Sequence, residues 1–133
     1  MPVTYSIDPQ RKRIDTVCTD PLTFEEVLNH FETLQHDPAC TGRLDVLLTV
    51  SDVHRLPQTS QLSVVSAEVR AVREKVEFEL CAVVAGRDAM FGMMRIFEVF
   101  AGEYFRELRV FREKAEAEAW LLEERGARDA RRK

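Results

Sequence analysis

The chain has 133 residues, of which 45% are hydrophobic and 32% are charged, and its formal net charge is −4. This length and composition are typical of one soluble domain with a single core, and they argue against two domains. No apolar run approaches the roughly 18 residues that a membrane-spanning helix needs. Residues 1–13 also lack the apolar middle of a signal peptide. We therefore expect a cytoplasmic protein.

Positive charge is concentrated at the C-terminal end of the chain. Residues 125–133 contain five basic side chains and one acidic side chain, a net of +4, so the preceding residues carry −8 within a total of −4. An acidic body repels phosphate backbones, and we expect no nucleic-acid partner. We interpret residues 1–124 as the folded domain and residues 125–133 as a basic, frayed tail.

Three cysteines, Cys18, Cys40 and Cys81, form an odd set without a Cys-x-x-Cys spacing. Cys18 and Cys81 lie in apolar strand patterns. Reduced, structural thiols are therefore expected, and the fold should not depend on a disulfide.

The N-terminal third predicts a hairpin followed by a helix. Residues 3–7 and 13–19 are short and rich in β-branched side chains, which indicates two antiparallel strands. Residues 23–37 show the apolar period of an amphipathic helix, and Thr23 and Glu26 have the spacing of a capping box. The apolar face of this helix comprises Phe24, Val27, Leu28, Phe31 and Leu34.

Strands and helices alternate along the rest of the chain. We expect a strand at 43–50, a turn at 51–60, a helix at 61–76, a strand at 78–86, a methionine- and phenylalanine-rich helix at 87–105, a strand at 107–112 and a helix at 113–125. Asp88 is placed to cap the methionine-rich helix. This order predicts an α/β fold with a small mixed five-stranded sheet and four helices on its two faces.

Two faces of the last helix compete for burial. One comprises Ala117, Trp120 and Leu121, and the other comprises Ala115, Ala119 and Leu122. We favour the first face, since it buries the single tryptophan.

Residues 78–121 resemble the SpoIIAA-like (STAS-like) superfamily. Members run from a buried strand into a Gly/Met/Phe-rich helix, a short LRVF strand and a last helix that ends in Ala-x-x-Trp-Leu. These endings are matched here by Leu108 to Phe111 and by Ala117, Trp120 and Leu121. The order of elements extends the resemblance to the whole chain. It implies the fold shared by anti-sigma-factor antagonists and by bacterial proteins suspected of binding small apolar molecules.

The antagonists of that superfamily carry a phosphorylatable serine in an Asp-Ser-Ser/Thr-Gly-type motif at the start of the helix after the third strand. This chain has VSDVHRLPQTSQL near the equivalent place, with Ser51 before an aspartate and no following glycine. The departure argues against a phospho-switch at Ser51. Ser60, at the next predicted helix start, stays the phosphorylation candidate, because free N–H groups there favour a phosphate.

Candidate binding residues follow from sheet architecture. In open α/β sheets, ligands bind beyond the carboxyl ends of the parallel strands. That rule selects two segments that could face each other, with the ligand- or partner-binding candidates Ser51, Asp52, His54 and Arg55 on the first and Arg87 and Asp88 on the second.

No catalytic residue, metal site or cofactor is predicted. Ser51, Asp52 and His54 have the residue types of a nucleophile triad, but neighbours in one loop rarely align as nucleophile, base and acid. The spacing of the histidines and cysteines lacks a closing pair of metal ligands. No glycine-rich phosphate loop is present.

The methionine-rich helix presents one broad apolar arc, which predicts a core-facing helix. The arc comprises Met90, Met93, Met94, Phe97, Phe100, Ala101, Tyr104 and Phe105. Phe91 and Val99 fall on the opposite side, which suggests a second apolar contact. Plain core, a homodimer contact and a ligand pocket stay open, with Met90, Phe91, Met94 and Val99 as candidates for the last two.

The functional expectation is a non-enzymatic cytosolic regulatory or binding domain of the SpoIIAA-like type that acts through protein–protein contacts. The alternative is a carrier or sensor of a small apolar ligand held between the sheet and the methionine-rich helix.

Overall fold

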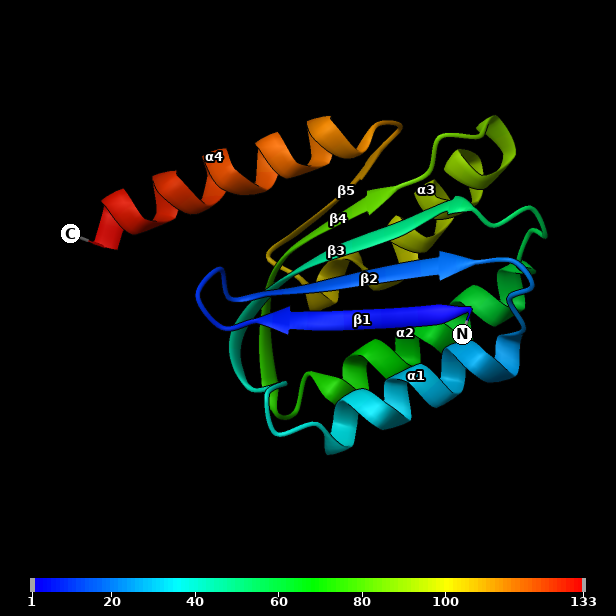
Figure 1. Ribbon diagram of the computed structural model, residues 1–133, viewed down its shortest axis with the longest axis horizontal. Coiled ribbons are helices and arrows are strands. Elements are labelled where there is room, and N and C mark those ends of the chain that lie inside the picture. Colours follow the sequence, from blue (N-terminus) through cyan, green and yellow to red (C-terminus); the bar gives the residue numbers. More distant parts are fainter. Residues whose placement is uncertain (1, 133) are drawn as a thin grey trace.

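A computed structural model describes residues 2–132, which form one five-stranded sheet with helices on both faces (Figure 1). The strands are β1 (Val3–Asp8), β2 (Arg13–Thr19), β3 (Gly42–Asp52), β4 (Val76–Val84) and β5 (Glu107–Phe111), and they follow this order across the sheet. The helices are α1 (Phe24–His36), α2 (Thr59–Val72), α3 (Asp88–Ala101) and α4 (Lys114–Arg132), with a 3₁₀ turn η1 (Gly102–Tyr104) after α3.

β1 pairs antiparallel with β2, and every other neighbouring pair of strands is parallel. The predicted α/β fold, with its N-terminal hairpin, mixed five-stranded sheet and four helices, is therefore confirmed. Figure 1 shows α1, α2 and α3 on one side of the sheet and α4 alone on the other.

The start of α1 follows half of the predicted capping box. The backbone N–H of Glu26 donates to Thr23 Oγ1 at 3.2 Å, as predicted. The Glu26 carboxylate, however, accepts the Thr23 hydroxyl at 2.9 Å instead of a backbone N–H.

Several predicted boundaries are wrong, and pairing in the sheet explains two of them. The methionine-rich helix, predicted at 87–105, ends at Ala101 and is followed by the 3₁₀ turn to Tyr104. β3 extends to Asp52, so Ser51 and Asp52 belong to a strand and not to a turn. α2 ends at Val72, and Val76 begins β4 opposite Gly42, where it is 1% exposed. Asp88 is the first residue of α3 and not its cap, and Arg87 occupies the cap position.

Alternation along the strands divides the interior into two cores. Ile14, Leu44, Val50, Phe78 and Cys81 face α1, α2 and α3, which add Leu34, Leu62, Val69, Met90, Met94 and Phe97. The opposite face holds a smaller cluster of Leu47, Leu80, Ala82 and Val84 against Ala117, Trp120 and Leu121. The favoured buried face of the last helix is therefore confirmed.

Residues 125–132 do not form the frayed tail that the sequence predicted, because they continue helix α4. α4 continues to Arg132, and Arg128 is 6% exposed because its guanidinium forms ion pairs with Asp45 and Glu79. Both Arg128 Nη2–Asp45 oxygen distances are 3.2 Å. A basic side chain can enter the interior here because two carboxylates from neighbouring strands compensate its charge.

None of the helices formed by residues 2–132 combines the length and the apolar character that a bilayer-spanning segment requires.

Candidate functional site

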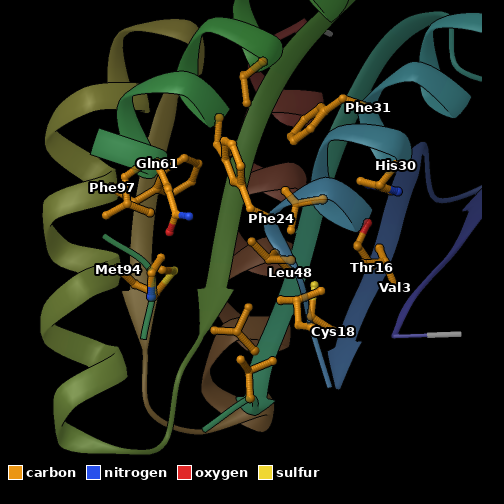
Figure 2. A pocket seen from close by; sticks show the side chains of 18 of the residues that line it. Val3, Thr16, Cys18, Phe24, His30, Phe31, Leu48, Gln61, Met94 and Phe97 are labelled. Carbon is orange, nitrogen blue, oxygen red and sulfur yellow. The ribbon is translucent and has the colours of Figure 1, made fainter. Parts of the chain in front are cut away.

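A cavity of about 450 Å³ lies between the sheet and the three helices of the larger core (Figure 2). Its floor comes from β2 and β3, and its walls come from α1, α2 and α3. Most of the lining is aliphatic or aromatic, with Phe24, Leu48, Val65, Met94 and Phe97 as examples. Its volume falls in the range of small-molecule sites, and its composition resembles theirs.

The cavity exists because α1 does not pack fully onto the sheet. Phe24, Val27 and Phe31 lie on the predicted apolar face of α1, yet they are only half-buried, and Leu34 is the buried residue of the helix. All four side chains line the cavity. The apolar face of α1 therefore faces a space of molecular size in place of side chains from the sheet.

The cavity reaches the surface where α1 and α2 begin. Thr23, Arg55, Leu56 and Gln58 are lining residues that are also exposed, and Leu56 is 45% exposed. They lie beyond the carboxyl ends of β2 and β3. This is the edge of the sheet at which the architecture predicts a ligand.

A few polar groups interrupt the apolar lining. Thr16, in the middle of β2, is 4% exposed, and its hydroxyl forms no hydrogen bond with any other described residue. His30 lies above it on α1, and Figure 2 shows the Thr16 oxygen directed toward the His30 ring. Gln61, on α2, projects into the opposite side of the cavity in the same view, where its Oε1 accepts the Gln58 N–H at 2.9 Å.

His30 is an uncharged imidazole at neutral pH. Burial lowers the pKa of His30 from 6.5 to about 4. Its ring packs edge-on against Tyr5, with centroids 5.3 Å apart, and against Phe31 at 5.5 Å. Arg55, at the opening, is therefore the one side chain that brings a positive charge to the cavity lining at neutral pH.

Three of the predicted site residues line the cavity, namely Arg55, Met90 and Met94. The prediction that the methionine-rich helix faces a core is correct, since Met90, Met94 and Phe97 are buried. The same three side chains also form one wall of the cavity. The same face of α3 therefore belongs to the core and lines the cavity, although the sequence analysis treated core and pocket as alternatives.

Ser51, Asp52 and His54 lie outside the cavity and do not assemble a triad. The Ser51 hydroxyl donates to the Val84 carbonyl at 3.4 Å. His54 pairs instead with Asp20, through both its backbone N–H and its ring Nδ1. These hydrogen bonds hold the pKa of Asp20 below its usual value.

Arg87 and Asp88 also lie outside the lining, in the exposed segment at the start of α3. The Arg112 guanidinium pairs with Asp88 at 2.5 Å and covers the Phe91 ring at 4.3 Å from its centroid. Phe91 is consequently half-buried beneath a side chain of this chain. Val99, in contrast, is 81% exposed.

Ser60 is the second residue of α2, where it is exposed. It stands close in sequence to the cavity opening at Gln58 but does not line the cavity.

Cys18, Cys40 and Cys81 are free thiols in the core, as the sequence predicts. Burial raises the pKa of Cys18 to about 11 and also raises that of Cys81. Both thiols line the cavity in their neutral form.

Thr16 and Gln61, which line the cavity, were missed as site residues by the sequence analysis, and His30 was considered only as a metal ligand. Thr16 carried a detectable signal, because it stands between Ile14 and Cys18 at the alternating positions of β2 that face the interior. Among residues 2–132, no group of three or more histidine, cysteine, aspartate or glutamate side chains is arranged to hold a metal ion.

No protein-family model, curated protein or solved structure matches the chain.

Proposed function

We propose that this chain is a non-catalytic domain that binds one small apolar molecule between the sheet and helices α1, α2 and α3. The main observation in support of this proposal is the cavity of about 450 Å³, which is lined mainly by aliphatic and aromatic side chains and is open at one edge. Binding sites for small molecules combine such walls with a few placed polar groups. The methionines of α3 add adaptable surface, because their flexible side chains fit ligands of different shape.

The half-buried face of α1 supports the same proposal. An apolar ligand would remove Phe24, Val27 and Phe31 from water, which is favourable by roughly 25 cal/mol per Å² of apolar surface. Membership of the SpoIIAA-like superfamily is a further proposal, supported by the motifs at residues 78–121 and by the order of the elements.

The test is a titration with the neutral fluorescent probe N-phenylnaphthylamine, together with native mass spectra of freshly purified protein. Val65→Phe places a ring in the cavity from α2 and should abolish probe binding. Val64→Phe is the matched control, because Val64 is the preceding residue, is 43% exposed and does not line the cavity. Equal binding by both variants, or no binding by the wild type, contradicts the proposal.

A second candidate is the protein–protein contact expected from the sequence. Its support is the outer side of α3, where Val99 and Ile96 stand three residues apart and are 81% and 38% exposed. The same native spectra report the number of subunits. A dimer that is lost in Val99→Ser would support this function, and a wild-type monomer would contradict the homodimer.

A further inference from the structure

The hydroxyl of Thr16 distinguishes one part of the cavity from the rest. Thr16 is 4% exposed, lines the cavity and has no hydrogen-bond partner among the described side chains and backbone groups. The hydroxyl oxygen itself is accessible from the cavity, since the fully buried side-chain atoms that lack a hydrogen-bond partner among residues 2–132 are Arg13 Nε and Asp15 Oδ1. An accessible hydroxyl in an apolar wall can form its hydrogen bond with whatever fills the cavity. The hydroxyl faces a space large enough for water or for a ligand atom, and that space supplies its partner.

The surroundings of Thr16 favour a neutral partner over an ionised one. Tyr5 and Leu48 lie opposite it on the two neighbouring strands, and His30 lies above it on α1. Because burial lowers the pKa of His30 to about 4, its imidazole is neutral. Arg55 stands at the opening, beyond the ends of β2 and β3. A carboxylate beside Thr16 would therefore lose its hydration at a place where Arg55 does not reach and where His30 would first have to take up a proton.

We propose that Thr16, beside His30, anchors a neutral oxygen of the ligand, so that the preferred ligands are apolar molecules with one hydroxyl or carbonyl group. This inference rests on the proposed binding function. The Thr16 hydroxyl can donate to a carbonyl, and it can donate to or accept from a hydroxyl. A ligand that displaces water from Thr16 must replace the hydrogen bond of that water, and a hydrocarbon cannot do so.

The experiment compares decane, decanol and decanoate as competitors of N-phenylnaphthylamine. The wild type should prefer decanol over decane by about three- to tenfold beyond their difference in hydrophobic transfer, the size expected for one net hydrogen bond. Decanoate should compete less well than decanol. If none of the three competes, the binding function itself fails. If decane and decanol compete equally after correction for transfer, only the anchor fails.

Two substitutions at one position isolate the hydroxyl. Thr16→Val keeps the shape of the side chain and should remove the preference for decanol while decane still binds. Thr16→Ser keeps the hydroxyl and should retain the preference. Thr49→Val is the control on the neighbouring strand, since Thr49 alternates with Leu48 and Val50 and so faces the other side of the sheet. Thermal melts establish that each variant is folded.

Two further results would overturn the anchor. One is an unchanged preference for decanol in folded Thr16→Val. The other is stronger competition by decanoate than by decanol in the wild type, lost in Arg55→Gln, because that outcome assigns the polar contact to an anionic head at the opening.

Discussion

The helices cover the two faces of the sheet to different degrees. On the face of α1, α2 and α3, helices enclose a cavity, and several apolar side chains of α1 stay half-buried. On the face of α4, Ala82 and Ala117 are fully buried, and Trp120 and Leu121 pack closely on them. One face therefore keeps space for a ligand, and the other closes tightly with small side chains.

Buried charged side chains lie between the sheet and α4, whereas the described residues of the opposite face include no buried charged side chain. Arg128 connects α4 to Asp45 on β3 and Glu79 on β4, and Arg13 on β2 connects to Asp15 at 2.7 Å and to Glu118 on α4 at 3.5 Å. The guanidinium of Arg109 also lies 5.3 Å from the Trp120 ring centroid. Specific ion pairs thus fix the position of α4. Apolar contacts hold α1 above the cavity, and hydrogen bonds hold its C-terminal end, where Lys75 donates to the Gln35 carbonyl at 2.8 Å and Tyr5 donates to Asp37 at 2.6 Å.

Arg128→Ala should cause the largest loss of stability, because it removes the cation that compensates the buried Asp45 carboxylate and one of the cations near Glu79, which keeps Arg106 at 3.8 Å. Removing one partner of a buried pair costs about 3 to 5 kcal/mol. Chemical denaturation measures the loss. Arg131→Ala is the control, since Arg131 is exposed on the same helix, and it should change the free energy of unfolding by less than about 0.5 kcal/mol.

The same network changes the expectation for the C-terminal segment. The sequence alone predicts that removal of residues 125–133 leaves the fold intact, but this truncation also removes Arg128. We now expect it to destabilise the protein about as much as Arg128→Ala does. An unchanged melting temperature after truncation would show that Asp45 tolerates the loss of Arg128.

The cavity face should be recognisable by its response to acid. The pKa of His30 is lowered from 6.5 to about 4 in the folded chain. Between pH 6.5 and pH 4, the His30 imidazole is therefore protonated in the unfolded chain and neutral in the folded chain. Stability from this group is fully present above pH 6.5 and is lost as pH falls toward 4, by about 2 to 3 kcal/mol.

Denaturation curves at several pH values between 7.5 and 4.5 measure this effect, and His30→Phe should flatten the dependence over that interval. His36→Gln is the control, because His36 lies exposed near the end of the same helix, and it should retain the wild-type dependence. Parallel curves for wild type and His30→Phe would mean that His30 titrates as a solvated imidazole.

Added volume should separate the two faces directly. Ala82→Leu forces extra methyl groups into the cluster of Trp120 and Leu121, where Ala82 is 0% exposed, and should cost about 1 to 3 kcal/mol. Val65→Phe adds volume to the cavity and should cost less than about 1 kcal/mol, because the ring enters existing space. Thermal melts compare them, and an equal loss in both would show that the cavity cannot accept a side chain.

The sequence predicted the fold because its local patterns agreed with its long-range pairing. β-Branched alternation marked the hairpin, and continuous apolar runs marked the inner strands. The spacing of Ala117, Trp120 and Leu121 identified the buried face of α4. These features depend on period and composition, which a single chain displays directly.

The cavity and the buried ion pairs could not be predicted in this way. A helical wheel shows that Phe24, Val27 and Phe31 share a face, but the same wheel describes a helix packed on a sheet and a helix above a cavity. Arg128 lies in a strongly charged segment, where no local pattern distinguishes it from exposed Arg131. Its burial depends on Asp45 and Glu79, which come from two distant strands.

The smallest effects are expected on the outer surfaces of the two layers, where Val99 on α3 and Leu122 on α4 are 81% and 67% exposed. Val99→Ser and Leu122→Ser should each change the free energy of unfolding by less than about 0.5 kcal/mol, because both residues stay largely exposed in the folded monomer. Phe97→Ala provides the contrast, since Phe97 projects inward from the same helix as Val99, is 5% exposed and should cost about 3 to 5 kcal/mol. Thermal melts at two protein concentrations decide whether a partner covers either surface. A loss of more than 1 kcal/mol in Val99→Ser, seen only at the higher protein concentration and not in Leu122→Ser, would show that α3 forms a subunit contact. The helices above the cavity would then have an outer partner that α4 lacks.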